Sequence, residues 1–136
     1  MKTKTIRQTA LFRASPRDVY EVLMDSRRHG ELTGSKASIS RKVGGKFSVY
    51  GGEITGSNLV LMQDKKIVQA WRYDMDGWPK GHYSKAVFTL SRLGNRTRLS
   101  FVQSRVPQAC AEEIAKGWKD YYWGPLRRML EDATEG

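Results

Sequence analysis

The chain has little of several residues that define whole classes of protein. Its 136 residues include one cysteine, Cys110, so an internal disulfide is excluded and no cysteine pair can form a zinc site. The two histidines, His29 and His82, lie far apart and belong to no set with metal-ligand spacing. No apolar run approaches the ~20 residues of a membrane span, and the N-terminus lacks a signal peptide's apolar centre. The sequence therefore predicts a cytoplasmic protein without a metal and outside the membrane.

The patterns of catalysis and of phosphate binding are also missing. No nucleophile is paired with either histidine, as a catalytic dyad requires. Gly44-Gly45 and Gly51-Gly52 precede predicted strands and not helices, which identifies them as turns and not as phosphate cradles. We expect no cofactor, no catalytic residues and no enzyme activity.

Positive charge is in excess, with 24 Lys and Arg against 14 Asp and Glu and a formal net charge of +10. The last thirty residues carry four basic and six acidic side chains, so the surplus lies in the rest of the chain. The basic residues occur singly or in pairs, such as Arg27-Arg28, and not in the blocks of about 5–8 that are typical of nucleic-acid binding. Nucleic acid is not the expected partner. A solvated basic face and a surface for an acidic protein both remain open.

The first third of the chain predicts one strand and two short helices. Polarity alternates over residues 4–13, with Ile6, Ala10 and Phe12 on one face. Ser15 and Pro16 then have the order of a helix cap and a first helical residue. Residues 27–34 predict a second short helix or turn, ended by glycine.

A long β region and one long helix follow. Pro107 ends the β region, and apolar residues recur at helical spacing over about 108–132. Pro125 should bend this helix, because it cannot donate to the carbonyl four residues earlier. Short glycine-rich turns between successive strands predict an antiparallel meander. The predicted strands are 36–43, 46–50, 53–62, 66–74, 83–93 and 96–106.

This order predicts an α+β fold in one domain, 1–136. A single antiparallel sheet of about seven strands needs a cover for its apolar face, and helix 108–132 is the only element long enough. We therefore expect a curved sheet wrapped around that helix, with two short helices after the first strand closing one end.

Several motifs in this order resemble one family. The chain is similar to the activator of heat-shock protein 90 ATPase homologue family, in the START-like (SRPBCC) helix-grip superfamily, and its spacing is close to the C-terminal domain of the eukaryotic co-chaperone. The resemblance implies the helix-grip fold, a co-chaperone-like role in the stress response, and a heat-shock protein 90-type chaperone as the partner whose ATPase is stimulated. The residues that carry it are Gly44-Gly45-Lys46-Phe47, Gly51-Gly52, 66–72, Trp78-Pro79, His82-Tyr83, Val106-Pro107 and 117–122.

The inner face of the sheet is the first candidate site. An apolar pocket with a few polar groups is the usual form of a small-molecule site, and Gln69 and Gln103 would orient a ligand there. The alternative to the co-chaperone is therefore a binding or transport protein for a small hydrophobic ligand. The same residues could equally form a packed core. They are Tyr20, Met24, Phe47, Val49, Ile67, Gln69, Trp71, Leu99, Phe101, Gln103, Trp118, Tyr122 and Met129.

The loop around Trp78 is the second candidate site. An exposed aromatic residue beside a basic one often anchors a protein contact, and Trp78 precedes Pro79 and Lys80. The alternative, in which Trp78 folds back and caps the edge of the sheet, remains open. The partner surface predicted here is Trp78, Pro79, Lys80, His82 and Tyr83.

Overall fold

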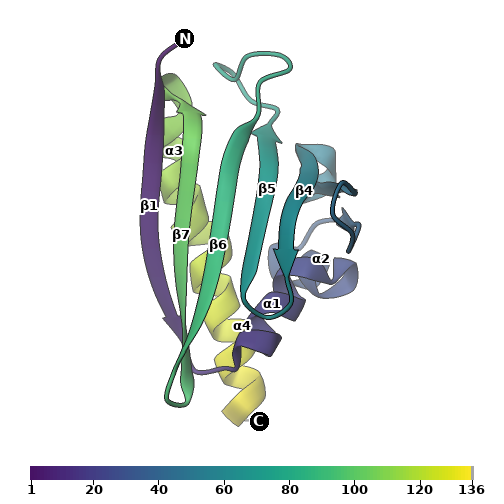
Figure 1. Cartoon of the computed structure of the whole chain (residues 1–136), viewed down its shortest axis with the longest axis vertical. Helices are drawn as coiled ribbons and strands as arrows, with labels where there is room; N and C mark the ends of the chain where they lie inside the picture. The colour runs from purple at the N-terminus through teal and green to yellow at the C-terminus, as the bar shows by residue number, and fades with distance from the viewer. Residues whose placement is uncertain (136) are drawn as a thin grey trace.

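The computed structural model describes residues 1–135, with side chains as far as Glu131. A seven-stranded sheet forms one layer, and the C-terminal helical segment lies across one of its faces (Figure 1). The elements are β1 (Thr3–Phe12), α1 (Pro16–Met24), α2 (Ser26–Thr33), β2 (Ser38–Ile39), β3 (Lys46–Val49), the 3-10 turn η1 (Tyr50–Gly52), β4 (Ile54–Met62), β5 (Lys66–Tyr73), β6 (Ser84–Leu93), β7 (Arg96–Pro107), α3 (Gln108–Trp118), the π-helical turn η2 (Lys119–Trp123) and α4 (Gly124–Glu135).

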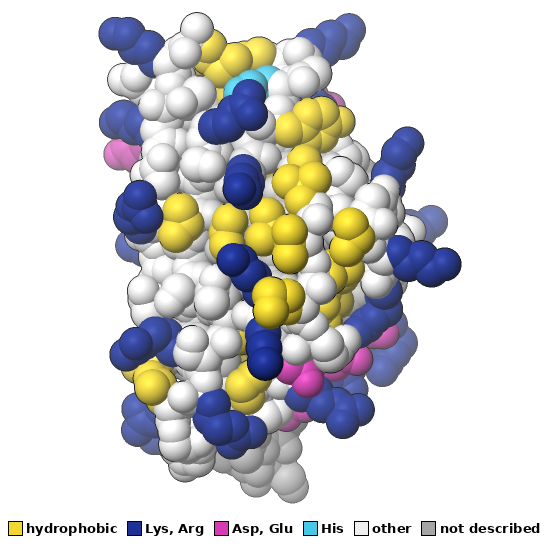
Figure 2. Space-filling model, in the orientation of Figure 1, with side chains coloured by type: hydrophobic (Ala, Val, Ile, Leu, Met, Phe, Trp, Pro, Cys, Tyr) yellow, Lys and Arg dark blue, Asp and Glu magenta, His cyan; other side chains and the backbone are white. Residues whose placement is uncertain are grey.

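The sheet confirms the predicted fold class. Its strand order is β1-β7-β6-β5-β4-β3-β2, and all neighbours are antiparallel. Buried residues alternate along β7, with Leu99, Phe101 and Gln103 facing the helices, so the predicted period of two holds. The opposite face of the sheet is open to solvent (Figure 2). No helix within residues 1–135 is long and apolar enough to cross a bilayer.

The predicted strand 36–43 is largely wrong, because only Ser38–Ile39 pairs as β2. The reason is the buried side chain of Asn58 on β4. Its Nδ2 donates to the carbonyls of Ser40 (2.7 Å) and Lys42 (3.1 Å), which satisfies them without a neighbouring strand. Residues 40–45 therefore form a turn fixed to β4 and not a continuation of the sheet.

The predicted start of α1 at Ser15 and Pro16 and the predicted end of α2 at glycine are confirmed, whereas α2 begins at Ser26 and not at residue 27. The hydroxyl of Ser15 accepts from the Asp18 amide at 3.1 Å, and Pro16 occupies the first turn of α1. Gly34 ends α2 with a φ of 72°, a left-handed conformation that favours glycine.

Pro125 affects the long helix through the π-helical turn that precedes it. In η2 the amide of Gly124 donates to Lys119 O, five residues back and not four. In a regular α-helix the ring of Pro125 would clash with the carbonyl of Tyr121, four residues earlier, and the wider π-helical turn includes that residue. It also lets Tyr122 and Trp123, which are adjacent in sequence, both pack on Trp118, at ring distances of 4.7 and 5.4 Å.

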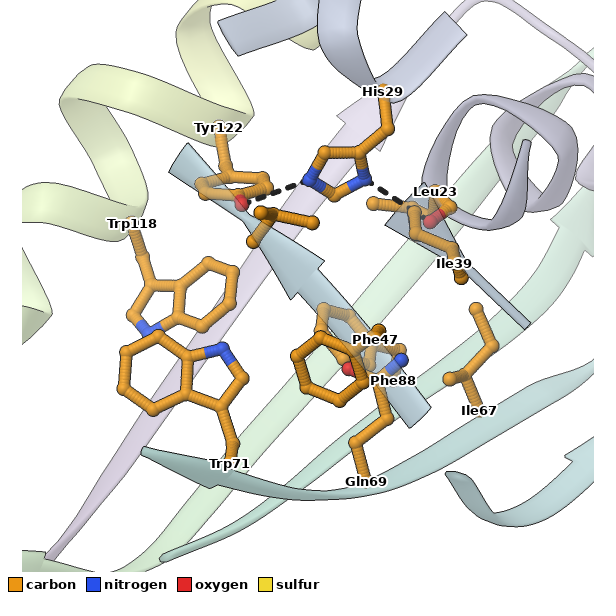
Figure 3. A pocket seen from close by; sticks show the side chains of 11 residues that line it. Leu23, His29, Ile39, Phe47, Ile67, Gln69, Trp71, Phe88, Trp118 and Tyr122 are labelled. Carbon is orange, nitrogen blue, oxygen red and sulfur yellow. Dashed lines mark hydrogen bonds between the residues drawn. The ribbon is translucent and has the colours of Figure 1, made fainter. Parts of the chain in front are cut away.

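A buried histidine joins α1, α2 and η2. His29 is 6% exposed; its Nδ1 lies 3.1 Å from Leu23 O and its Nε2 lies 2.9 Å from the Tyr122 hydroxyl (Figure 3). A carbonyl can only accept, so Nδ1 carries the proton of the neutral ring and Nε2 accepts from Tyr122. Burial lowers the pKa of His29 below its ordinary 6.5, against a smaller opposite effect of the Leu23 carbonyl.

The burial of His29 predicts a pH-dependent stability. Because its pKa is lower in the folded than in the unfolded chain, the unfolded state takes up the proton first as the pH falls. The free energy of unfolding should therefore decline as the pH is lowered below about 6.5, and denaturant unfolding between pH 5 and 8 would measure it. In His29→Phe this decline should disappear, and the variant should be less stable at pH 8 by about 1–3 kcal/mol, since Tyr122 loses its acceptor.

His82→Gln is the matched control, because it removes the other histidine and should keep the decline. An undiminished decline in His29→Phe would show that other groups cause it.

Candidate functional site

The interior between sheet and helix contains a small cavity of about 20 Å³ (Figure 3). That is room for about one water molecule, whereas small-molecule sites occupy roughly 300–1,000 Å³. The residues that line it are Leu23, His29, Ile39, Phe47, Val49, Ile67, Gln69, Trp71, Phe88, Trp118 and Tyr122.

Aromatic rings fill most of the remaining space. The ring of Trp118 lies 4.4 Å from that of Phe101 and 5.6 Å from that of Trp71, centroid to centroid. Phe88 and Phe101 are 5.0 Å apart, and Trp123 stacks on Trp118 with an interplanar angle of 17°. These are ordinary packing distances for aromatic pairs, so the interior is a packed core.

The buried amides are used within this core. Trp118 Nε1 donates to Gln103 Oε1 at 2.7 Å, and Gln103 Nε2 donates to Ser84 Oγ at 3.0 Å. Gln69 Nε2 donates to Asn58 Oδ1 at 3.1 Å. Gln103 therefore fixes the orientation of Trp118, and both its oxygen and its nitrogen are engaged by protein groups.

The structure separates the predicted cavity residues into two sets. Tyr20, Met24, Leu99, Phe101, Gln103 and Met129 pack elsewhere in the core and do not reach the cavity. They were grouped with the others because strand alternation and helical spacing give the face of a residue but not its position along that face. The predicted residues that do line the cavity are Phe47, Val49, Ile67, Gln69, Trp71, Trp118 and Tyr122.

Sequence reasoning missed four lining residues, and His29 is the most informative of them. The others are Leu23, Ile39 and Phe88. The available signal was weak, because His29 and Leu32 are the buried residues of a helix that is otherwise polar. Their spacing of three is that of one helix face.

Of the two alternatives left open for Trp78, the exposed one is wrong. Its side chain is 6% exposed, its ring packs on Trp71 at 5.7 Å, and its Nε1 donates to His82 O at 2.9 Å. Folding back buries a large apolar ring and gives its N–H a partner, which favours the second of the two alternatives. Of the other loop residues, Lys80 and Tyr83 are exposed, while Pro79 and His82 are half-buried.

The outer face of the sheet carries a row of valines that sequence reasoning did not find. Val60, Val68, Val87 and Val102 are direct partners across β4, β5, β6 and β7. Val68, at the centre, is 4% exposed, whereas Val60 at one end is 42% exposed beside exposed Leu59 and Met62. We call these six residues the valine patch. Only the register of the strands brings its members together.

Basic side chains surround the valine patch. Arg7 pairs with Val102 in the ladder, Lys66 pairs with Met62, and Lys85 precedes Val87 by two residues on the same face. Hydrophobic and Lys or Arg side chains are interspersed over the face in Figure 2, where few acidic side chains are visible. The outer face is therefore both partly apolar and positively charged.

Comparisons with known proteins agree with this fold. The family model described as "Activator of Hsp90 ATPase homolog 1-like protein" matches residues 13–131. The chain is 38% identical over 118 residues to the activator of 90 kDa heat shock protein ATPase homolog of Dictyostelium discoideum, covering 86% of this chain and 30% of that protein. It is 27% identical to the human homolog 1 over 126 residues, covering 93% and 36%. The chain thus spans about a third of the length of these relatives.

Solved structures show the same fold at low identity. An HSP90 activator from Plasmodium falciparum superposes with a TM-score of 0.87 at 24% identity, covering 93% of this chain and 96% of that one. The Aha1 dimer from Colwellia psychrerythraea gives a TM-score of 0.79 at 19% identity, covering 94% and 96%. With the family model matched over residues 13–131, the chain belongs to the family of Activator of Hsp90 ATPase homolog 1-like proteins.

Proposed function

We propose that the chain is a co-chaperone-like domain that binds a heat-shock protein 90-type chaperone through the outer face of its sheet and stimulates its ATPase. The observation that carries the proposal is the filled interior, with a cavity of only about 20 Å³. Function then rests on the surface, and the relatives named as activators of the 90 kDa heat shock protein ATPase supply the class of partner.

The composition of the outer face supports an acidic partner surface. The valine patch offers apolar area whose burial contributes roughly 25 cal/mol per Å². The surrounding Arg7, Lys66 and Lys85 would attract acidic side chains and set the orientation of the complex. Tyr83, 43% exposed, borders a hollow over β3, β4 and β5 that Lys46 also lines.

The structure does not favour the small-ligand carrier. A ligand of drug size would have to displace the rings of Trp71, Phe101 and Trp118, and the amide of Gln103 is already used by the protein.

The first test mixes the chain with a purified heat-shock protein 90-type chaperone. We expect binding at low ionic strength, weakening as salt is added because the interface is basic, together with a raised rate of ATP hydrolysis. Calorimetric titration and an ATPase assay measure the two effects. No binding at low salt would refute the proposal.

A second test places the interface. Lys85→Glu reverses a charge beside the valine patch, so affinity for the chaperone should fall roughly tenfold, which corresponds to about 1.4 kcal/mol. Lys116→Glu makes the same change of charge on an exposed lysine of α3, on the other side of the molecule, and should leave affinity unchanged. Equal losses in both variants would indicate a non-specific charge effect and a different docking surface.

A further inference from the structure

A second surface of opposite character lies between the sheet and the helical layer. It is an open groove of about 560 Å³, bounded by η1, the start of β4, the end of β5, the loop after β5, α3 and η2. Its walls combine tyrosines with carboxylates, and no lysine or arginine lines it among the described residues.

Four tyrosines and Trp71 form the aromatic part of the groove. Tyr50 lies 6.2 Å from Tyr121 and 6.1 Å from Tyr122, ring to ring, and the ring of Tyr73 lies in the same groove. Tyr121 is 60% exposed, an unusual amount for a large aromatic side chain. Tyr121 therefore presents its ring to solvent beside the half-buried rings of Tyr50 and Tyr73, while Tyr122, 5% exposed, belongs to the buried part of the lining.

Two backbone irregularities position these rings. Tyr50 has a φ of 52°, a left-handed conformation that is costly for a residue with a side chain. Tyr121 and Tyr122 belong to the π-helical turn η2. Strained backbone and π-helical turns concentrate at functional sites, and here both border the same groove.

Three carboxylates, Glu53, Asp76 and Glu113, line the groove without a basic partner. The Tyr73 hydroxyl donates to Glu53 at 3.3 Å, and no ion pair with Lys or Arg involves any of the three within the described chain. Burial first, and then the charge of Glu53, raise the pKa of Tyr73, so its hydroxyl remains a donor at neutral pH. The chain as a whole has 24 Lys and Arg against 14 Asp and Glu, so an acidic groove contrasts with its positive net charge.

The carboxylates do not converge as a metal site would. Within the described residues no group of three His, Cys, Asp or Glu side chains is placed to hold a metal ion. Carboxylates spaced around aromatic rings suit a larger organic cation, which interacts with the ring faces as well as with the charges.

We propose that this groove binds a lysine or arginine side chain of a basic peptide segment on a partner protein. The ammonium or guanidinium would lie against Tyr50 and Tyr121, with Glu53 and Glu113 as its counter-charges. The inference goes beyond the proposed function, because the outer face attracts an acidic surface, while the groove attracts a basic one.

Gly117 gives a way to close the groove. A Cβ at this position would meet only Tyr121 Cδ2, at 3.8 Å, so a larger side chain would extend into the open space without moving the backbone. Gly117→Leu should therefore fill the groove and leave the fold intact, and Gly117→Ala should fill it less.

The test is an NMR titration of the full chain with a short acetylated, amidated Gly-Lys-Gly-Lys-Gly peptide. We expect salt-sensitive binding with amide shifts centred on Tyr73, Gly117 and Tyr121, and no binding of the peptide with glutamine in place of lysine. Glu113→Gln should weaken binding about threefold or more, and Gly117→Leu should abolish it. Glu112→Gln, an exposed neighbour outside the groove, is the matched control and should bind like the unmodified chain.

Equal binding of the lysine and glutamine peptides, no binding at all, or shifts confined to another surface would overturn the proposal. Affinity for the chaperone should be unaffected by Glu113→Gln, whereas Lys85→Glu should reduce it. Failure of the groove can therefore be distinguished from failure of the proposed function.

Discussion

Trp118 is the side chain on which the sheet and the helical layer meet. Its ring contacts Phe101 on β7, Trp71 on β5 and two aromatic residues of η2, and its N–H is held by Gln103 at 2.7 Å. Burying this large ring removes much apolar area from water, but its indole N–H would be costly to bury without an acceptor. Gln103 Oε1 is that acceptor. The hydrogen bond from Trp118 to Gln103 therefore fixes the distance and rotation of the helix over the sheet. The remaining rings pack around that arrangement.

Because the interior is filled by side chains, any binding partner has to be recognised at the surface. A helix over a concave sheet can enclose a large cavity, yet here the space that remains is about 20 Å³. The surface is divided between a basic, partly apolar outer face and an acidic groove lined by tyrosines. Surfaces of opposite charge on the same chain favour contacts with two different partner segments, since each surface repels the segment that the other attracts.

The proline in the long helix connects the core to the groove. Pro125 cannot continue an ordinary helix, and the wider turn before it brings Tyr122 and Trp123 onto Trp118 and places Tyr121 at the groove. The sequence signalled a disturbance at this point, but its form, a π-helical turn, depends on the burial of neighbouring rings. One backbone constraint thus serves both the packing of the interior and the shape of a surface.

The sequence by itself determined the order of elements, the helix caps at Ser15 and Gly34 and the faces of the strands, because these follow from local chemistry and periodicity. It also carried the family, through motifs that resemble those of known members. It predicted that Phe47, Trp71 and Trp118 face one interior, but not whether that interior is open, which depends on ring orientations. The short β2 and the burial of Trp78 were decided by distant partners, Asn58 and Trp71. The valine patch and the tyrosine groove join residues far apart in the chain. Only strand register and helix docking, which are tertiary interactions, could bring them together.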